Sequence, residues 1–403
     1  MKQHSIILSI LVFSITILSC NRPAGKKESE LSKPDYGSYA LKMGETVLRM
    51  YPQVWNIEER EEPRWTYTFG LVASAMMDLY ESTGRQEFHD YAKSYIDSLV
   101  TPEGEIKTYR MEDYNIDQVN SGKVLMRLYL ETGQENYRVA IETLRQQLRD
   151  HPRTEVGGFW HKKRYPHQMW LDGLYMGGPF YAQYAALFDE PGDFDEIIRW
   201  YANMERVARD SATGLLYHGW DESREQAWAD RQTGRSPNFW GRGMGWYGMA
   251  LVDIMDFIPA GHPGRDTITG IISRMAEAIV KVQDEETGTW YQVLDQGGRE
   301  GNFLEGSVSC MFSYFLLKAV NKGYLESSAY RAPARRSFEG IVNTLVTGDA
   351  DGNLVISPVC AVAGLGGDPY RDGSYEYYIN EQRRDNDPKA VGPFIMAAIE
   401  YSR

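Results

Sequence analysis

Cysteine is scarce in this chain of 403 residues, which contains only Cys20, Cys310 and Cys360. The two later cysteines lie neither in a CxxC pair nor at a spacing typical of zinc ligands. The sequence therefore predicts neither a scaffold held by disulfides nor a structural zinc site. Whether Cys310 and Cys360 pair with each other is left open.

Excess positive charge is also missing. The formal net charge is −13, and Lys and Arg form no basic stripe, which argues against nucleic acid as a partner. An acidic surface also repels a long polyanion, although a local pocket for one anionic sugar remains compatible with it. Aromatic residues make up 13% of the chain, with 10 Trp and 27 Tyr. Such rings suit stacking against the apolar faces of sugars, although core packing alone also explains them.

The apolar run near the N-terminus, residues 6–18, is too short for a membrane-spanning helix. It follows Lys2 and ends at Ser19-Cys20, and this arrangement resembles a bacterial lipoprotein signal in which Cys20 becomes the lipidated first residue. Residues 21–34 are polar and predict a flexible tether. We therefore expect an exported bacterial lipoprotein, anchored to a membrane through Cys20 alone and facing the periplasm. An ordinary signal peptide or a short anchor is the alternative.

The sequence lacks the alternating strand and helix pattern of a parallel sheet. It contains a repeat instead. LYESTGRQEFHDYAKSYIDSLV begins at Leu79 and LYLETGQENYRVAIETLRQQLR begins at Leu128, 49 residues later. Apolar residues follow helix-face spacing on both sides of Gly84 and Gly133, where a helix should end. Each unit is therefore predicted to be a helix, a tight turn and a second helix.

Less regular hairpins continue along the chain, and the first and last helices complete a sixth pair. The predicted helices are 172–188 with 194–209, 242–257 with 266–283, 304–321 with 330–347, and 36–51 with 387–401. The sequence therefore predicts an all-α fold, a six-hairpin (α/α)6 barrel over residues 35–403. Glycine and alanine in the first helix of a predicted hairpin, such as 172–188, suit an inner ring in which helices approach closely. An open helical solenoid is the alternative.

Long loops precede the inner helices at residues 154–166, 211–223, 285–296 and 349–359. Loops of this length in a compact domain are usually functional, and all of them are expected at one pole of the ring. The helix starts at that pole carry polar and aromatic side chains. These are Trp65, Tyr67, Asn115, Asp117, Asn120, Trp170, Asp172, Trp240, Arg242, Trp246, Glu305 and Asp387. Each one alone is explained by helix capping or packing, but their recurrence predicts a site.

Asp172 is the most informative of these residues, because it lies among Trp170, Leu171, Leu174 and Tyr175. A carboxylate is expensive to bury without a partner. One interpretation is a helix N-cap, since Asp accepts hydrogen bonds from the first free amides of a helix. The other is a general acid whose pKa is raised by its apolar surroundings.

Several blocks of sequence resemble one enzyme family. They are YNIDQVNSGK, HKKRYPHQMWLDGLYMGGPF, YHGWDES, FWGRGMGWYGMAL and NDPKAVGPF. The chain from about Tyr36 to its end resembles glycoside hydrolase family 105, the unsaturated rhamnogalacturonyl hydrolases. The unsaturated glucuronyl hydrolases of family 88 share that fold and are less similar in these blocks. The resemblance implies the same (α/α)6 barrel, and it implies no cofactor and no metal.

The resemblance also implies an unusual reaction. Polysaccharide lyases leave a 4,5-unsaturated uronic acid at the non-reducing end, and these hydrolases hydrate its C4=C5 vinyl ether. An acid protonates C4, water adds at C5, and the hemiketal opens and releases the sugar. Asp172 is implied to supply the proton and then to accept one from water. This role requires a protonated Asp172 near neutral pH.

Other residues are implied to bind the substrate, an unsaturated uronide oligosaccharide. Asp117 matches an acid that holds sugar hydroxyls, with a helix cap as the alternative. His218 matches a histidine beside the reacting ring. Arg242 is a candidate for the uronate carboxylate, with a structural salt bridge as the alternative. The further candidates are Trp240 and Trp246 as ring platforms or core residues, together with Tyr67, Lys162 and Gln168.

Two other functions remain open at this point. A conventional glycosidase of the same fold would use Asp172 and Asp117 as an acid and base pair. A lipid-tethered sugar-binding protein would keep the tryptophans and would not depend on Asp172.

Overall fold

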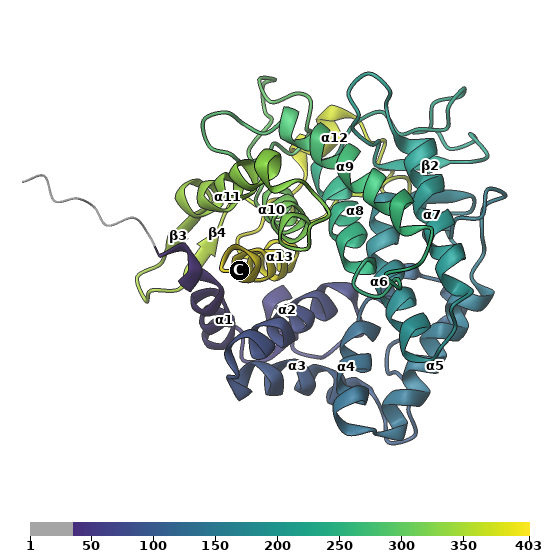
Figure 1. The fold of residues 1–403 in the computed structure, drawn as a ribbon, viewed down its shortest axis with the longest axis vertical. Helices are drawn as coiled ribbons and strands as arrows, with labels where there is room; N and C mark the ends of the chain where they lie inside the picture. The colour runs from purple at the N-terminus through teal and green to yellow at the C-terminus, as the bar shows by residue number, and fades with distance from the viewer. Residues whose placement is uncertain (1–34) are drawn as a thin grey trace, which may run out of the picture. The chain divides into compact units, whose positions relative to one another are not determined.

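The fold is a ring of helical hairpins (Figure 1). The structure is a computed structural model that describes residues 35–403. The predicted signal peptide, the lipidation site Cys20 and the tether lie outside the described residues. Within residues 35–403, no helix is both long and apolar enough to cross a membrane.

Two concentric sets of helices form the ring. The inner set is α2 (Tyr67–Thr83), α4 (Gly122–Thr132), α6 (Leu171–Leu187), α8 (Gly241–Ile254), α10 (Gly306–Asn321) and α13 (Pro388–Tyr401). The outer set is α1 (Tyr39–Met50), α3 (Gln86–Leu99), α5 (Glu135–Asp150), α7 (Asp193–Ala208), α9 (Arg265–Lys281) and α11 (Ser327–Thr344). Each inner helix packs against its neighbours in the inner set and against outer helices.

The ring closes through the last helix. Helix α13 packs against both α10 and α2, and α1 covers it from outside (Figure 1). The predicted pairing of the first and last helices and the predicted (α/α)6 barrel are therefore confirmed, and the solenoid alternative is excluded. Gly84 and Gly133 end α2 and α4 in the left-handed conformation that glycine adopts readily, as the repeat predicted.

Burial differs between the two sets of helices. Helix α6 is buried nearly all round, whereas α7 is amphipathic and exposes its charged face. Gly178 of α6 lies so close to α7 that a Cβ atom there would collide with the hydroxyl of Tyr201. This contact supports the prediction that small residues let the inner helices approach their neighbours.

The sequence did not predict several short elements. They are β1 (Gln168–Trp170) paired with β2 (Gly219–Asp221), β3 (Val346–Gly348) paired with β4 (Leu354–Ile356), and α12 (Tyr375–Asn380), together with the 3-10 turns η1 (Tyr36–Ser38), η2 (Val54–Glu58), η3 (Met111–Asp113) and η4 (Ile116–Val119). Three-residue strands show no recognisable periodicity. The predicted helix 330–347 was wrong at its end, because residues 346–348 form β3.

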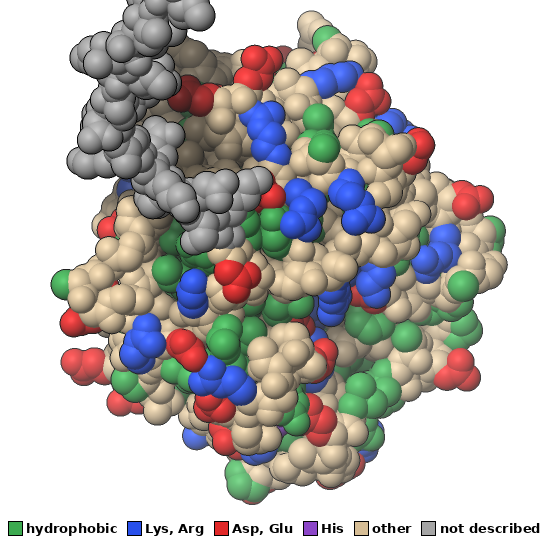
Figure 2. All heavy atoms as spheres, turned by 60° about the vertical axis from the view of Figure 1, so that its left-hand side comes forward, with side chains coloured by type: hydrophobic (Ala, Val, Ile, Leu, Met, Phe, Trp, Pro, Cys, Tyr) green, Lys and Arg blue, Asp and Glu red, His purple; other side chains and the backbone are tan. Residues whose placement is uncertain are grey.

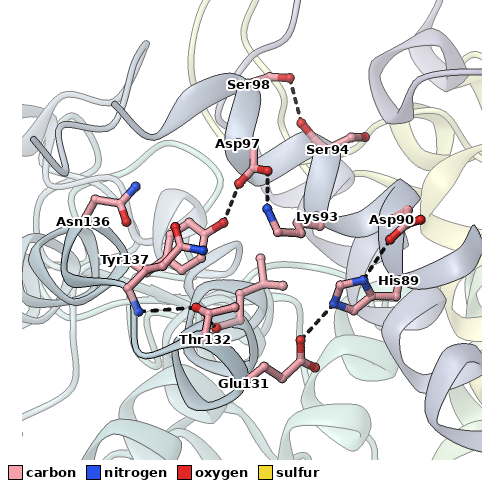
Figure 3. Close-up of polar contacts among 12 residues, drawn as sticks. His89, Asp90, Lys93, Ser94, Asp97, Ser98, Glu131, Thr132, Asn136 and Tyr137 are labelled. Carbon is pink, nitrogen blue, oxygen red and sulfur yellow. Dashed lines mark hydrogen bonds and ion pairs between the residues drawn. The ribbon is translucent and has the colours of Figure 1, made fainter. Parts of the chain in front are cut away.

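Polar contacts join neighbouring hairpins at the surface (Figure 3). Nε2 of His89 lies 2.8 Å from Oε2 of Glu131, and Asp97 contacts both Lys93 and Tyr137. Acidic and basic side chains are interspersed on the face drawn in Figure 2. Exposed pairs of this kind contribute little to stability, so the buried helix faces hold the ring together. Cys310 and Cys360 are both buried free thiols.

Candidate active site

A two-stranded sheet brings Asp172 and His218 together. In β1 and β2, Trp170 pairs with Gly219, and the backbone amide of Leu171 donates to the carbonyl of His218 at 3.0 Å. Asp172 lies two residues after the end of β1, in the first turn of α6, and His218 directly precedes β2. Strand pairing therefore places two residues that are 46 positions apart in the sequence at one helix start.

The capping interpretation of Asp172 is wrong. The N-cap position of α6 is Trp170, and no side chain makes a capping hydrogen bond there. Side-chain caps do occur at neighbouring helix starts: Glu305 caps α10, Asp387 caps α13 and Asn115 caps the turn η4. Asp172 is therefore a carboxylate at a helix start whose position capping does not explain.

Asp172 faces His218 instead. Oδ2 of Asp172 lies 3.2 Å from Nε2 of His218, and the Asp172 side chain is 13% exposed while that of His218 is fully buried. The alignment falls short of a good hydrogen bond for both atoms, and apo catalytic contacts commonly tighten only when substrate binds.

The sequence predicted a raised pKa for Asp172, and the structure corrects this. Burial raises the pKa of Asp172, but the polar contact with His218 and the positive charges that His218 and His161 carry in their protonated forms outweigh burial and hold it below its ordinary value. The apolar side chains that suggested a raised pKa are present. No local sequence pattern indicated that a histidine contacts the Asp172 carboxylate.

Asp117 is held by two basic side chains. Its Oδ2 lies 2.5 Å from Nζ of Lys162, and its Oδ1 lies 3.5 Å from Nε2 of His161. The ring of His161 stacks on that of Trp170 at 4.3 Å between centroids. Burial lowers the pKa of His161 to about 4, so this ring is neutral near pH 7. Two of the predicted residues, Asp117 and Lys162, therefore form one ion pair.

Arg242 is a buried cation on α8, with 1% of its surface exposed. It donates to the carbonyl oxygen of Cys360 and, from Nη1 at 3.3 Å, to Oγ of Ser307, while its Nε has no hydrogen-bond partner among the described residues. The acids at the neighbouring helix starts are engaged elsewhere: Glu305 with Ser307 and Asp387 with Lys389. Within residues 35–403 Arg242 thus lacks the carboxylate partner that the salt-bridge alternative requires.

The two tryptophans of α8 and its N-cap are both 1% exposed. The ring of Trp246 stacks on Tyr175 at 4.9 Å and meets Tyr67 edge-on at 6.1 Å. Trp240 stacks on Tyr378 at 5.8 Å. Each of the two indoles therefore packs against protein rings, and their use as sugar platforms stays a prediction.

Two further predicted residues lie beside this cluster. Tyr67 begins α2, and burial together with the charge of Asp117 raises its pKa well above 10. Gln168 of β1 is 1% exposed, and its side-chain oxygen accepts from Nε1 of Trp170 at 3.1 Å. Gln168 therefore holds an aromatic neighbour of the site in position.

A groove of about 600 Å³ opens beside Asp117. Its acids Glu112 and Asp113 both pair with Arg110, at 3.1 and 3.8 Å. Its wall also holds Gln118, whose buried Oε1 has no hydrogen-bond partner in the part of the chain that the structure describes. Four basic side chains line the groove: Arg64, Lys162, Lys163 and Arg164.

Sequence reasoning missed two residues of this cluster. His161 lies inside the block HKKRYPHQMWLDGLYMGGPF, but the sequence analysis assigns it no role in the site. Tyr378 lies on α12, in a segment with no motif, and its hydroxyl is 2.7 Å from Nδ1 of His218. No sequence signal connects positions 378 and 218, because the fold alone brings them together.

Comparison with known proteins gives the family. The family model described as Glycosyl Hydrolase Family 88 matches residues 39–403. A solved family 105 glycoside hydrolase from Clostridium acetobutylicum ATCC 824 is 42% identical, with a TM-score of 0.87, over 90% of this chain and 99% of that one.

Curated relatives agree with this assignment. A protein of Agrobacterium fabrum, Atu3128, is 36% identical over 237 residues, which is 56% of this chain and 97% of that protein. The unsaturated rhamnogalacturonyl hydrolase YesR of Bacillus subtilis is 26% identical over 261 residues, 63% of this chain and 71% of that protein. The chain therefore belongs to glycosyl hydrolase family 88 in the sense of that model, and its predicted relationship to the family 105 enzymes is confirmed.

Proposed function

We propose that this hydrolase releases the 4,5-unsaturated uronic acid from the non-reducing end of lyase-generated oligosaccharides by hydrating the C4=C5 bond. The observation that carries the proposal is the position of Asp172. This acid begins an inner helix without capping it, contacts a buried histidine and keeps part of its surface open.

Each step of the reaction needs one group at this site. The Asp172 carboxyl gives its proton to C4, and the positive charge that develops at C5 is shared with the ring oxygen. Water then adds at C5 while the Asp172 carboxylate accepts a proton from it, so that the acid is regenerated. The resulting hemiketal opens and releases the remaining saccharide.

The negative charge of the substrate favours the protonated form of Asp172, which the free enzyme disfavours. The pKa of Asp172 is low in the unliganded site. A uronate carboxylate bound nearby is a second negative charge, which raises the pKa of a neighbouring acid. Binding of the anionic sugar therefore favours the protonated form of Asp172 that the first step requires.

The surroundings of Asp117 argue against a conventional acid and base pair. Asp117 is paired with Lys162 and lies near His161, and an ion pair of this kind keeps a carboxylate from acting as a free base. We assign Asp117 and Lys162 to the sugar hydroxyls instead.

A rhamnogalacturonan fragment is the substrate that we propose. The groove beside Asp117 carries four basic side chains although the whole chain has a net charge of −13. A saccharide that continues past the scissile bond and contains further uronates would match this local charge. The relationship to YesR supports the same polymer. We also propose that Cys20 anchors the enzyme to a membrane facing the periplasm.

A panel of lyase products tests the proposed function. Unsaturated galacturonyl-rhamnose oligosaccharides should lose the absorbance of their enol ether as the uronic acid is released. Saturated oligosaccharides of the same length, and a saturated aryl glycoside, should not react. Turnover of the saturated compounds would favour the two-carboxylate glycosidase, and binding without turnover of any compound would favour a sugar-binding protein.

Replacement of Arg242 tests the carboxylate site. Arg242→Met keeps much of the volume and removes the charge, so KM for the unsaturated uronide should rise roughly 10- to 100-fold, the scale of one charged hydrogen-bonding partner. The value of kcat should change less, because this contact is made in both ground and transition states. Arg274→Met, on the outer helix α9 and 52% exposed, is the control. An unchanged KM in a folded Arg242→Met enzyme would show that Arg242 does not bind the uronate carboxylate and has a structural role only.

A further inference from the structure

Tyr378, in the C-terminal part of the chain, contacts His218, the residue that faces Asp172. Its hydroxyl lies 2.7 Å from Nδ1 of His218, the opposite ring nitrogen from the one that faces Asp172. Both Tyr378 and His218 are fully buried. The three side chains therefore form a line from the hydroxyl, through the imidazole, to the carboxylate.

The hydrogen-bonding capacity of Tyr378 decides the direction of this line. Within residues 35–403 its hydroxyl has no partner other than His218. A buried hydroxyl proton without an acceptor is costly. If the hydroxyl accepted from Nδ1–H, its own proton would be left without a partner. If it donates to Nδ1, its proton is satisfied, and the neutral ring carries its own proton on Nε2.

We propose that Tyr378 is a positioning residue that donates to Nδ1 of His218 and thereby fixes the Nε2–H tautomer against Asp172. The consequence for catalysis rests on the proposed function. An Nε2–H group favours the carboxylate form of Asp172, which is the form that accepts a proton from water in the second step. The other tautomer would offer a lone pair to the protonated acid and would favour the first step.

The direction of hydrogen bonding from Tyr378 through His218 thus sets the balance between the acid and base roles of Asp172. Other charged and titratable groups act on these three side chains or on their immediate neighbours, and they contribute a background that Tyr378 does not control. They are His161, Asp117 and Lys162 from the loops, Tyr67 and Arg242 from α2 and α8, Asp387 from the start of α13, and Cys360, Arg371 and Tyr377 from the C-terminal segment.

The variant Tyr378→Phe removes the hydroxyl and keeps the ring that stacks on Trp240. Neither tautomer of His218 then satisfies Nδ1, so the preference for Nε2–H is lost. The high-pH limb of the kcat/KM profile, where the rate falls as Asp172 loses its proton, should move to higher pH by about one unit, the size expected when one buried polar group loses its preference. A merely structural role would lower the rate at every pH without moving the limb.

Tyr375→Phe is the matched control. Tyr375 begins the same helix α12, and its hydroxyl donates to the carbonyl oxygens of Arg299 and Glu300, at 3.1 and 3.0 Å, rather than contacting His218. Its limb should stay at the wild-type pH. An unmoved limb in Tyr378→Phe, or an equal shift in both variants, would overturn the proposal.

A second measurement needs no active variant. Nitrogen-15 NMR of the histidine-labelled wild-type protein at neutral pH should show His218 protonated at Nε2 and bare at Nδ1, with its signals identified by their loss in His218→Gln. A proton on Nδ1 at this pH, whether the ring is neutral or cationic, would overturn the proposal. The NMR result does not depend on turnover, so failure of the proposed function and failure of the tautomer assignment are distinguished.

Discussion

Asp172→Asn should lower kcat by about 10²–10⁴-fold, the usual range for loss of a general acid. Asparagine keeps the shape of the side chain but supplies no proton of useful acidity. The melting temperature should hardly change, because Asp172 caps no helix and, within residues 35–403, its ion-pair contact is with His218 alone. Rates on an unsaturated lyase product and thermal unfolding of the same sample check both parts.

The control for this variant is Asp195→Asn. Asp195 also lies in the first turn of a helix, the outer helix α7, and is 76% exposed. The same chemical change at that position should leave kcat intact. Full activity of Asp172→Asn would remove Asp172 from the mechanism, and a large fall in melting temperature would return it to a structural role.

The pH dependence of the wild-type enzyme follows from the same residue. The reactive form of Asp172 is protonated, so the rate should fall as pH rises through the pKa of Asp172. That pKa is low in the free enzyme, and a bound uronate raises it. Because kcat/KM reports the free enzyme and kcat reports the complex, kcat should stay high to a higher pH than kcat/KM.

The sequence was sufficient to predict the ring because its signals are local and repeated. Helix-face spacing and the glycine stops at Gly84 and Gly133 need only neighbouring residues to be recognised. The strands β1 and β2 could not be predicted in this way. Each has three residues, and each is stabilised by a partner some 50 positions away.

The candidate site was predictable for a different reason. The helix starts of a closed ring meet at one pole, so Asp117, Asp172 and Arg242 could be grouped before any contact was known. The contacts of these side chains and the pKa of Asp172 could not be predicted. The low pKa of Asp172 depends on His218, which is brought to it by strand pairing, and His218 in turn contacts Tyr378 from a segment without periodicity.

The central claim is that Asp172 protonates C4 of the unsaturated sugar. The most direct test is to find which atom of the product receives a proton from solvent. If Asp172 protonates C4, its proton has exchanged with solvent, and turnover in D₂O should place one deuteron at C4 of the released keto sugar. Incubation of unlabelled product in D₂O measures any exchange after release. Proton NMR or mass spectrometry at early times should show the labelled 4-deoxy-5-keto uronic acid from the first turnover. Release of a uronic acid that still contains its C4=C5 bond, with no deuterium at C4, would contradict the account, because that product comes from attack at the anomeric carbon.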